Sequence, residues 1–232
     1  MRSASVVAFG LALAFSLVSC RSETPAPQGP PQAPASAAPE PPAALLSPEK
    51  AAEKAPEVYK ARFTTAKGDF VIEVRRAWAP NGADRFYNLV RIGYYDGISF
   101  FRVVKGFMAQ TGIHGSPAVS AKWLMARIPD DPPAGQSNAR GTVTFATSGP
   151  NARTTHFFIN YGNNANLDSV GFTPIGTVVQ GMEVVESLYG GYGDSPAFGV
   201  RGPDQGRLTM EGNAYLKAEF PDLDYVKATR ID

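Results

Sequence analysis

Short apolar runs separated by turn-forming residues constrain the fold of this chain more than any other feature of its sequence. Runs of about four to eight residues bounded by glycine, proline or aspartate predict β-strands. We expect strands at residues 59–65, 70–74, 100–104, 108–111, 142–147, 156–160 and 175–179, with a last strand near Tyr225. Only residues 80–92 and 182–189 have the apolar spacing of a helix. Residues 113–140 predict a long ordered loop, and the chain after Gly190 predicts an irregular tail.

Many short strands with only two helices favour an antiparallel β-structure over alternating strand–helix units. The first helix should bury one apolar face, which consists of Ala83, Phe86, Leu89 and Val90. Periodicity alone does not choose between a closed barrel and an open sheet with helices. The fold class predicted at this point is therefore mainly β.

The first 20 residues predict an export signal. Arg2 gives a positive start, and the apolar run at residues 6–18 is too short to span a bilayer comfortably. The run ends in Leu17-Val18-Ser19-Cys20, which resembles the bacterial lipobox, a motif whose cysteine becomes lipidated. We expect a lipoprotein signal peptide over residues 1–20, with an ordinary cleaved signal as the alternative. Lipidated Cys20 would anchor the exported protein to a bacterial membrane, facing the periplasm or the cell surface.

Residues 21–57 are rich in proline and alanine and predict a disordered tether. A short helix at residues 47–55 is compatible with this segment, because Ser47 is a good cap and Pro48 suits a first turn. The folded domain is expected at residues 58–232, with a C-terminal extension from about residue 190.

The composition excludes several classes of function. The 22 basic and 21 acidic side chains leave no basic excess for nucleic acid. One cysteine and two histidines cannot build the usual zinc sites, and the sequence has no phosphate-binding loop, so we expect no metal and no cofactor.

Five segments carry a more specific signal, and their order and spacing extend from about residue 63 to residue 188. They are residues 100–112, which include Phe100-Phe101-Arg102, and residues 141–151, 155–159, 167–168 and 175–185. Together they resemble the cyclophilin family of peptidyl-prolyl cis–trans isomerases. The resemblance implies a closed eight-stranded antiparallel β-barrel capped by two α-helices. It also implies that proline-containing polypeptide segments are the partners, and we expect a monomer.

Rotation about a prolyl peptide bond breaks no covalent bond but faces a barrier of about 18–20 kcal/mol. A donor aimed at the proline nitrogen would stabilise the twisted state, because that nitrogen regains a lone pair as resonance is lost. The resemblance implies that Arg102 is this donor and that Gln110 supports it. The plainer alternatives are a surface salt bridge for Arg102 and an ordinary strand position for Gln110.

The resemblance also assigns the substrate-binding residues. The apolar pocket for the proline ring would contain Phe107, Met108, Phe158 and Leu167, each of which could otherwise be plain core. The backbone at Ala146 and Thr147 would pair with the bound peptide as an added strand. Phe172 is assigned to a pocket wall where the family often has histidine.

His156 stands beside the predicted pocket at a position where the family usually has glutamine. Protonation of His156 is one hypothesis for pH-dependent binding, and a neutral His156 is the alternative that we favour. Two other functions compete with catalysis. A binding module would use the same groove without needing Arg102. A hydrolase built on His156 lacks a nucleophile elbow in the sequence.

Overall fold

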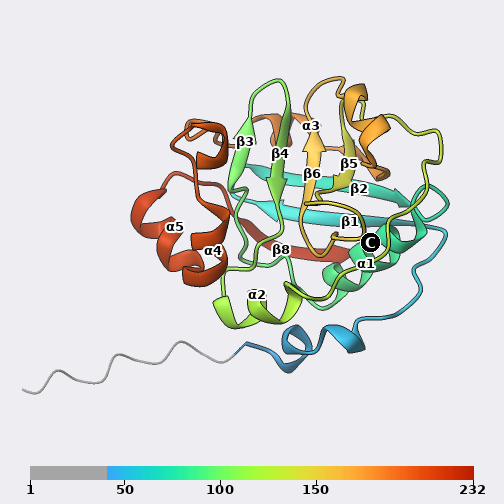
Figure 1. Ribbon diagram of the computed structural model, residues 1–232, viewed down its shortest axis with the longest axis horizontal. Helices are drawn as coiled ribbons and strands as arrows, with labels where there is room; N and C mark the ends of the chain where they lie inside the picture. The colour runs from blue at the N-terminus through green and yellow to red at the C-terminus, as the bar shows by residue number, and fades with distance from the viewer. Residues whose placement is uncertain (1–40) are drawn as a thin grey trace, which may run out of the picture. The chain divides into compact units, whose positions relative to one another are not determined.

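Eight antiparallel strands form one sheet in the computed structural model, which describes residues 41–232 (Figure 1). The strands pair in the order β3-β4-β6-β5-β7-β2-β1-β8. Their bounds are β1 Val58–Thr65, β2 Gly68–Arg75, β3 Arg102–Val104, β4 Met108–Thr111, β5 Thr142–Phe145, β6 Phe157–Asn160, β7 Pro174–Gln180 and β8 Val226–Ile231. The mainly β fold class is confirmed.

One face of this sheet encloses an aromatic core. Phe63 on β1 lies directly opposite Phe70 on β2, and their rings stack with centroids 5.0 Å apart. The predicted face of helix α1 (Pro80–Arg91) packs on them, with the Phe86 ring 6.0 Å from Phe63 and 5.2 Å from Phe157. All four predicted apolar residues of this helix are buried. The core therefore forms where alternating strand residues meet a helix of matching apolar spacing.

The predicted closed barrel is wrong, because strand pairing does not continue around the sheet. β3 and β8 end the pairing order, and an isolated bridge between Ser99 and Tyr225 links their neighbouring segments. Three backbone hydrogen bonds of 2.8–3.0 Å join residues 97–100 to residues 224–226, but beyond them β3 pairs with β4 while β8 continues along β1. The two edges meet only briefly, and the sheet is curled but open.

The expectation of two α-helices is also wrong, because residues 41–232 contain five. The helices besides α1 are α2 Pro117–Trp123, α3 Met182–Glu186, α4 Gln205–Glu211 and α5 Asn213–Glu219. Helix α2 lies in the expected loop, and α4 and α5 lie in the expected irregular tail. Each of these three has seven residues, which is too short to display a clear helical period in the sequence.

The last part of the predicted tether packs on the domain. Short 3₁₀ turns at Ala43–Leu46 and Pro48–Lys50 precede β1, and Leu45 is buried. The Trp123 indole N–H donates to the Leu45 carbonyl at 2.8 Å, and the Ala55 N–H donates to the Asp84 carboxylate at 2.9 Å. The prediction of a disordered tether therefore does not hold at Leu45, Glu53 and Ala55, whose backbone groups bond to the domain.

The predicted signal, its Cys20 and residues 21–40 lie outside the residues that the structure describes. Within the described part of the chain, no helix combines the length and the apolar character needed to cross a membrane.

The C-terminal extension folds against the sheet. A second apolar cluster, separate from the main core, contains Phe101, Ile113, Leu208, Tyr215, Leu216, Phe220 and Leu223. Phe101 immediately precedes β3, so helices α4 and α5 pack beside the edge of the sheet that carries Arg102 (Figure 1). This arrangement brings residues far apart in the sequence to one end of the sheet.

Candidate active site

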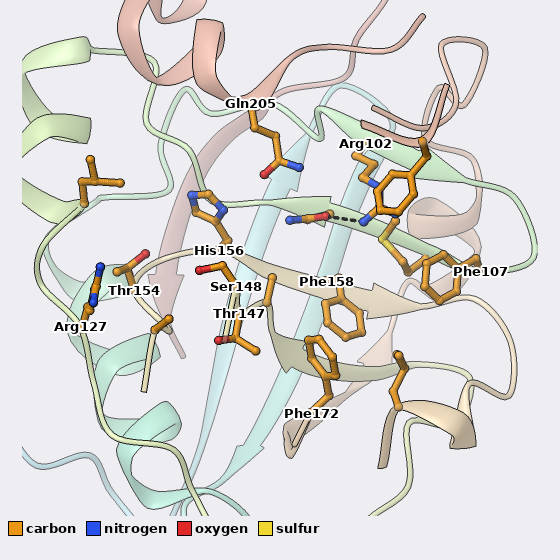
Figure 2. A pocket seen from close by; sticks show the side chains of 17 residues that line it. Arg102, Phe107, Arg127, Thr147, Ser148, Thr154, His156, Phe158, Phe172 and Gln205 are labelled. Atoms are coloured by element: carbon orange, nitrogen blue, oxygen red, sulfur yellow. Dashed lines mark hydrogen bonds between the residues drawn. The ribbon is translucent and has the colours of Figure 1, made fainter. Parts of the chain in front are cut away.

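The ten residues predicted to bind or act on substrate all line one cavity of about 550 Å³ (Figure 2). They are Arg102, Phe107, Met108, Gln110, Ala146, Thr147, His156, Phe158, Leu167 and Phe172. Residues of β3, β4 and β6 line the cavity together with residues of the neighbouring loops. The structure thus brings the predicted residues together, while their individual roles stay predictions.

Strand register explains why the side chains of Arg102, Gln110 and Phe158 meet in the cavity. Arg102 on β3 lies opposite Gln110 on β4, and Gln110 lies opposite Phe158 on β6. Residues directly opposite one another on adjacent strands project from the same face of a sheet. The three side chains therefore share one face, although 56 positions separate the first from the last in the sequence.

Arg102 donates from Nη1 to Oε1 of Gln110 at 3.0 Å, which is the dashed line in Figure 2. Gln110 is buried, and the hydrogen bond from Arg102 engages its amide oxygen. The guanidinium also lies near the Phe107 ring, with 5.9 Å between Cζ and the ring centroid. A permanent positive charge is thus held at the edge of an apolar cavity.

Aromatic side chains form one end of the cavity. The rings of Phe158 and Phe172 meet edge to face with centroids 5.8 Å apart, and Phe107 lies toward the same end (Figure 2). Phe172 is held there by a hydrogen bond from its N–H to the Leu167 carbonyl at 3.4 Å. Met108 beside them is buried. This end suits an apolar ring of modest size.

The backbone at Ala146 and Thr147 has fewer hydrogen-bonding groups available to a bound peptide than predicted. The Ala146 N–H already donates to the His156 carbonyl at 2.9 Å. Thr147 forms a local turn, in which its Oγ1 donates to the Gly149 carbonyl at 2.5 Å. The Ala146 carbonyl and the Thr147 backbone, but not the Ala146 N–H, are therefore the groups that can pair with an extended peptide.

His156 lies at the cavity margin with its ring 6.1 Å from that of Phe101. Burial lowers the pKa of His156 to about 4. The ring is therefore neutral between about pH 5 and 8, where an unperturbed histidine titrates. This favours the neutral alternative over pH-dependent binding through His156.

Several cavity residues were missed by the sequence reasoning. They are Leu124, Arg127, Ser148, Ala152, Thr154, Phe198 and Gln205. Gln205 begins α4 and Phe198 follows α3 by twelve positions, so both belong to the C-terminal extension. Their neighbouring sequence has no motif, because long-range packing of the extension brings them to the cavity.

The comparison with family models identifies the chain. The model described as "Cyclophilin type peptidyl-prolyl cis-trans isomerase/CLD" matches residues 60–200. The chain belongs to this family of peptidyl-prolyl cis–trans isomerases. The cyclophilin resemblance in the motifs is confirmed, and so is the enzyme class.

Curated relatives agree with this assignment. The chain is 34% identical over 157 residues to peptidyl-prolyl cis-trans isomerase CYP18-1 of Arabidopsis thaliana, covering 64% of this chain and 94% of the relative. It is 36% identical over 136 residues to peptidyl-prolyl cis-trans isomerase cyp18 of Streptomyces antibioticus, covering 55% and 81%. The relative from Dickeya dadantii, peptidyl-prolyl cis-trans isomerase A, is 34% identical over 131 residues, covering 54% and 68%.

A solved structure supports the fold alone. The cyclophilin type isomerase of Cryptosporidium parvum superposes with a TM-score of 0.54 at 21% identity, covering 75% of this chain and 98% of that one. The family match ends at residue 200, so α4, α5 and β8 lie beyond it.

Proposed function

We propose that this isomerase accelerates rotation about X–Pro bonds through Arg102, which stabilises the twisted amide. The observation that carries the proposal is the guanidinium at the edge of the apolar cavity, bonded to Gln110 at 3.0 Å. A guanidinium stays charged at any physiological pH and presents several donors in one plane. It can therefore meet the lone pair that develops on the proline nitrogen.

The interaction favours catalysis because it is stronger in the twisted state than in the planar one. In the planar amide the nitrogen lone pair is delocalised and accepts hydrogen bonds poorly. As the bond twists, the lone pair localises and the donor binds it more strongly. Phe107, Phe158 and Phe172 would hold the proline ring, so that the rest of the chain rotates against it.

Prolyl isomerisation of a short peptide by the Arg102→Ala variant tests this role. Removal of a donor that acts mainly in the transition state lowers kcat roughly 10²- to 10³-fold. Arg75→Ala is the matched control, because Arg75 lies on β2 at the surface and contacts Glu73. Full activity in Arg102→Ala, with an unchanged melting temperature, would show that the catalytic group is elsewhere.

We also propose that the enzyme is a lipoprotein of the bacterial envelope that assists the folding of exported proteins. The support is the apolar run that ends at Cys20 and the proline-rich segment that follows it. On this proposal the protein is a monomer held at a membrane by acyl chains on Cys20. Cys20→Ser should abolish incorporation of labelled palmitate and move the protein into the aqueous phase on detergent partitioning. Unchanged labelling would contradict the proposal.

A further inference from the structure

The guanidinium of Arg102 has a second partner that the sequence did not indicate. Arg102 Nε donates to Oδ1 of Asp194 at 2.5 Å, and Nη2 donates to Oδ2 at 3.1 Å. The Arg102 and Asp194 side chains are only 15% and 19% exposed. A carboxylate bound by two parallel charge-assisted bonds fixes the plane of a guanidinium as well as its position.

The remaining donors of Arg102 can be counted. A guanidinium has five N–H groups, of which Nε carries one and each Nη carries two. Asp194 takes the Nε hydrogen and one Nη2 hydrogen, and Gln110 takes one Nη1 hydrogen. One hydrogen on each Nη is left. Asp194 therefore occupies the Nε–Nη2 edge of the guanidinium and leaves one donor on each Nη for another partner.

An aromatic ring from the same part of the chain limits motion out of this plane. Cζ of Arg102 lies 4.9 Å from the centroid of the Phe198 ring, within the range of a cation–π contact. Phe198 belongs to a 3₁₀ turn, Pro196–Phe198, that begins two positions after Asp194. Gln110, Asp194 and Phe198 thus hold the guanidinium from three directions.

Asp194 is itself held by its loop. Its Oδ1 accepts the Ser195 N–H at 2.7 Å, and its carbonyl accepts the Gly202 N–H at 3.0 Å. A Cβ at residue 202 would lie 2.1 Å from the Asp194 carbonyl oxygen, so only glycine closes the loop there. Burial alone would raise the pKa of Asp194, but the hydrogen bonds from Arg102 and Ser195 and the charge of Arg102 lower it below its ordinary value. The carboxylate is therefore ionised at neutral pH.

We propose that Asp194 is a positioning residue for the isomerase reaction, which orients Arg102 so that its free Nη hydrogens face the proline nitrogen. This inference rests on the catalytic role proposed for Arg102. Asp194 acts through Arg102 and does not touch the substrate. Correct orientation of a catalytic group matters most in the twisted state, so the loss of Asp194 should lower kcat and leave substrate binding nearly intact.

The test is steady-state isomerisation of a proline peptide by the whole protein carrying Asp194→Asn. Asparagine keeps the size of the side chain but loses the charge and one of the two acceptors. We expect kcat to fall roughly ten- to a hundredfold while KM stays nearly constant. Asp222→Asn is the matched control, because Asp222 lies in the same C-terminal extension and accepts from the Tyr192 hydroxyl away from the cavity. This control should keep wild-type kcat.

A double-mutant cycle separates positioning from a merely structural effect. If Asp194 acts through Arg102, then Asp194→Asn should cause no further loss of kcat in the Arg102→Ala protein. A further loss of the same size would overturn the proposal, because it would show that Asp194 acts on the site by another route. A rise in kcat in the single variant would also overturn it and would indicate that Asp194 restrains Arg102 from the substrate.

The outcomes for Arg102 and Asp194 can be told apart. Loss of activity in Arg102→Ala with wild-type kcat in Asp194→Asn would overturn the positioning role alone. Wild-type activity in Arg102→Ala would overturn the proposed catalytic role first, and the positioning role with it. A fall in kcat in both single variants, without additivity, is the result that we expect.

Discussion

The two sides of the Arg102 guanidinium are built in different ways. On one side, Gln110 belongs to the strand next to Arg102 and lies directly opposite it in the register. On the other side, Asp194 comes from a loop 92 positions away in the sequence and is held by its own backbone contacts. The first contact follows from strand pairing alone. The second exists only when the C-terminal extension has folded against the sheet.

The same contrast holds for the aromatic end of the cavity. Phe158 lies on β6 in the middle of the sheet and is only 5% exposed. Phe172, which contacts it, follows the 3₁₀ helix Ala165–Val170 and is half-buried. Residues on the sheet serve both the fold and the site, whereas residues on the loops can serve the site at less cost to the fold. Matched substitutions on the two sides can separate these contributions.

The largest expected effect is a loss of stability when Phe158, on the sheet side of the cavity, is replaced. Phe158→Ala should lower the free energy of unfolding by about 3–5 kcal/mol, since it removes a buried ring from an interior strand of the sheet. Phe172→Ala removes the same group from the loop side and should cost about 1 kcal/mol or less, because that ring is already half-solvated. Urea denaturation of both variants measures the difference. Equal losses would show that the loop ring is part of the core.

A smaller effect, a fall in kcat, is expected when the loop that holds Asp194 is disturbed. Gly202→Ala should displace the Asp194 loop, because the new Cβ would lie 2.1 Å from the Asp194 carbonyl oxygen. We expect kcat to fall about tenfold, as for any displacement of a catalytic group by a fraction of an ångström. Gly190→Ala is the matched control, since its Cβ would meet Val103 at an ordinary 3.4 Å. Wild-type kcat in Gly202→Ala would mean that the loop absorbs the change without moving Asp194.

A separate effect appears only when the pH is lowered below neutral. Burial lowers the pKa of His156 and of His114 to about 4, from the ordinary 6.5. The unfolded chain therefore takes up protons before the folded protein does, and the free energy of unfolding should fall as pH is lowered from about 6.5 toward 4. His156→Gln should remove the part of this fall in the free energy of unfolding that His156 causes and leave the part that His114 causes. Melting temperatures across that range measure it.

The pH dependence of activity should not involve His156 over the neutral range. The kcat/KM profiles of the wild type and of His156→Gln should have the same shape between about pH 5 and 8, because the ring carries no charge there. A wild-type midpoint near pH 6.5 that disappears in the variant would contradict this.

The sequence was sufficient to predict the strands, because these depend on local spacing, and the resemblance to the cyclophilin family was needed to predict the sheet side of the site. Arg102 and Gln110 lie within one hairpin, and the runs that form β1 to β7 are bounded by clear turn residues. The closed barrel was mispredicted because closure depends on how the segment around Ser99 meets Tyr225, which local spacing does not encode.

Asp194 could not be predicted for a related reason. Asp194-Ser195-Pro196 is an ordinary turn sequence, and nothing in it indicates that the carboxylate would meet an arginine on β3. The short helices α4 and α5 that precede β8 were missed as well, although Asp204 caps α4 by accepting the Arg207 N–H at 2.8 Å. A cap identifies where a helix starts, but only tertiary packing stabilises one this short.

The packing of residues 43–57 moves the boundary of the folding unit toward the N-terminus. An expressed fragment that began at Val58 would leave the buried indole N–H of Trp123 without the Leu45 carbonyl, at a cost of about 1–3 kcal/mol. Asn88 would also lose its two hydrogen bonds with the backbone of Glu53, at 2.7 and 3.1 Å. A soluble enzyme for study should therefore start before Ala43, well upstream of the first strand and of the family match.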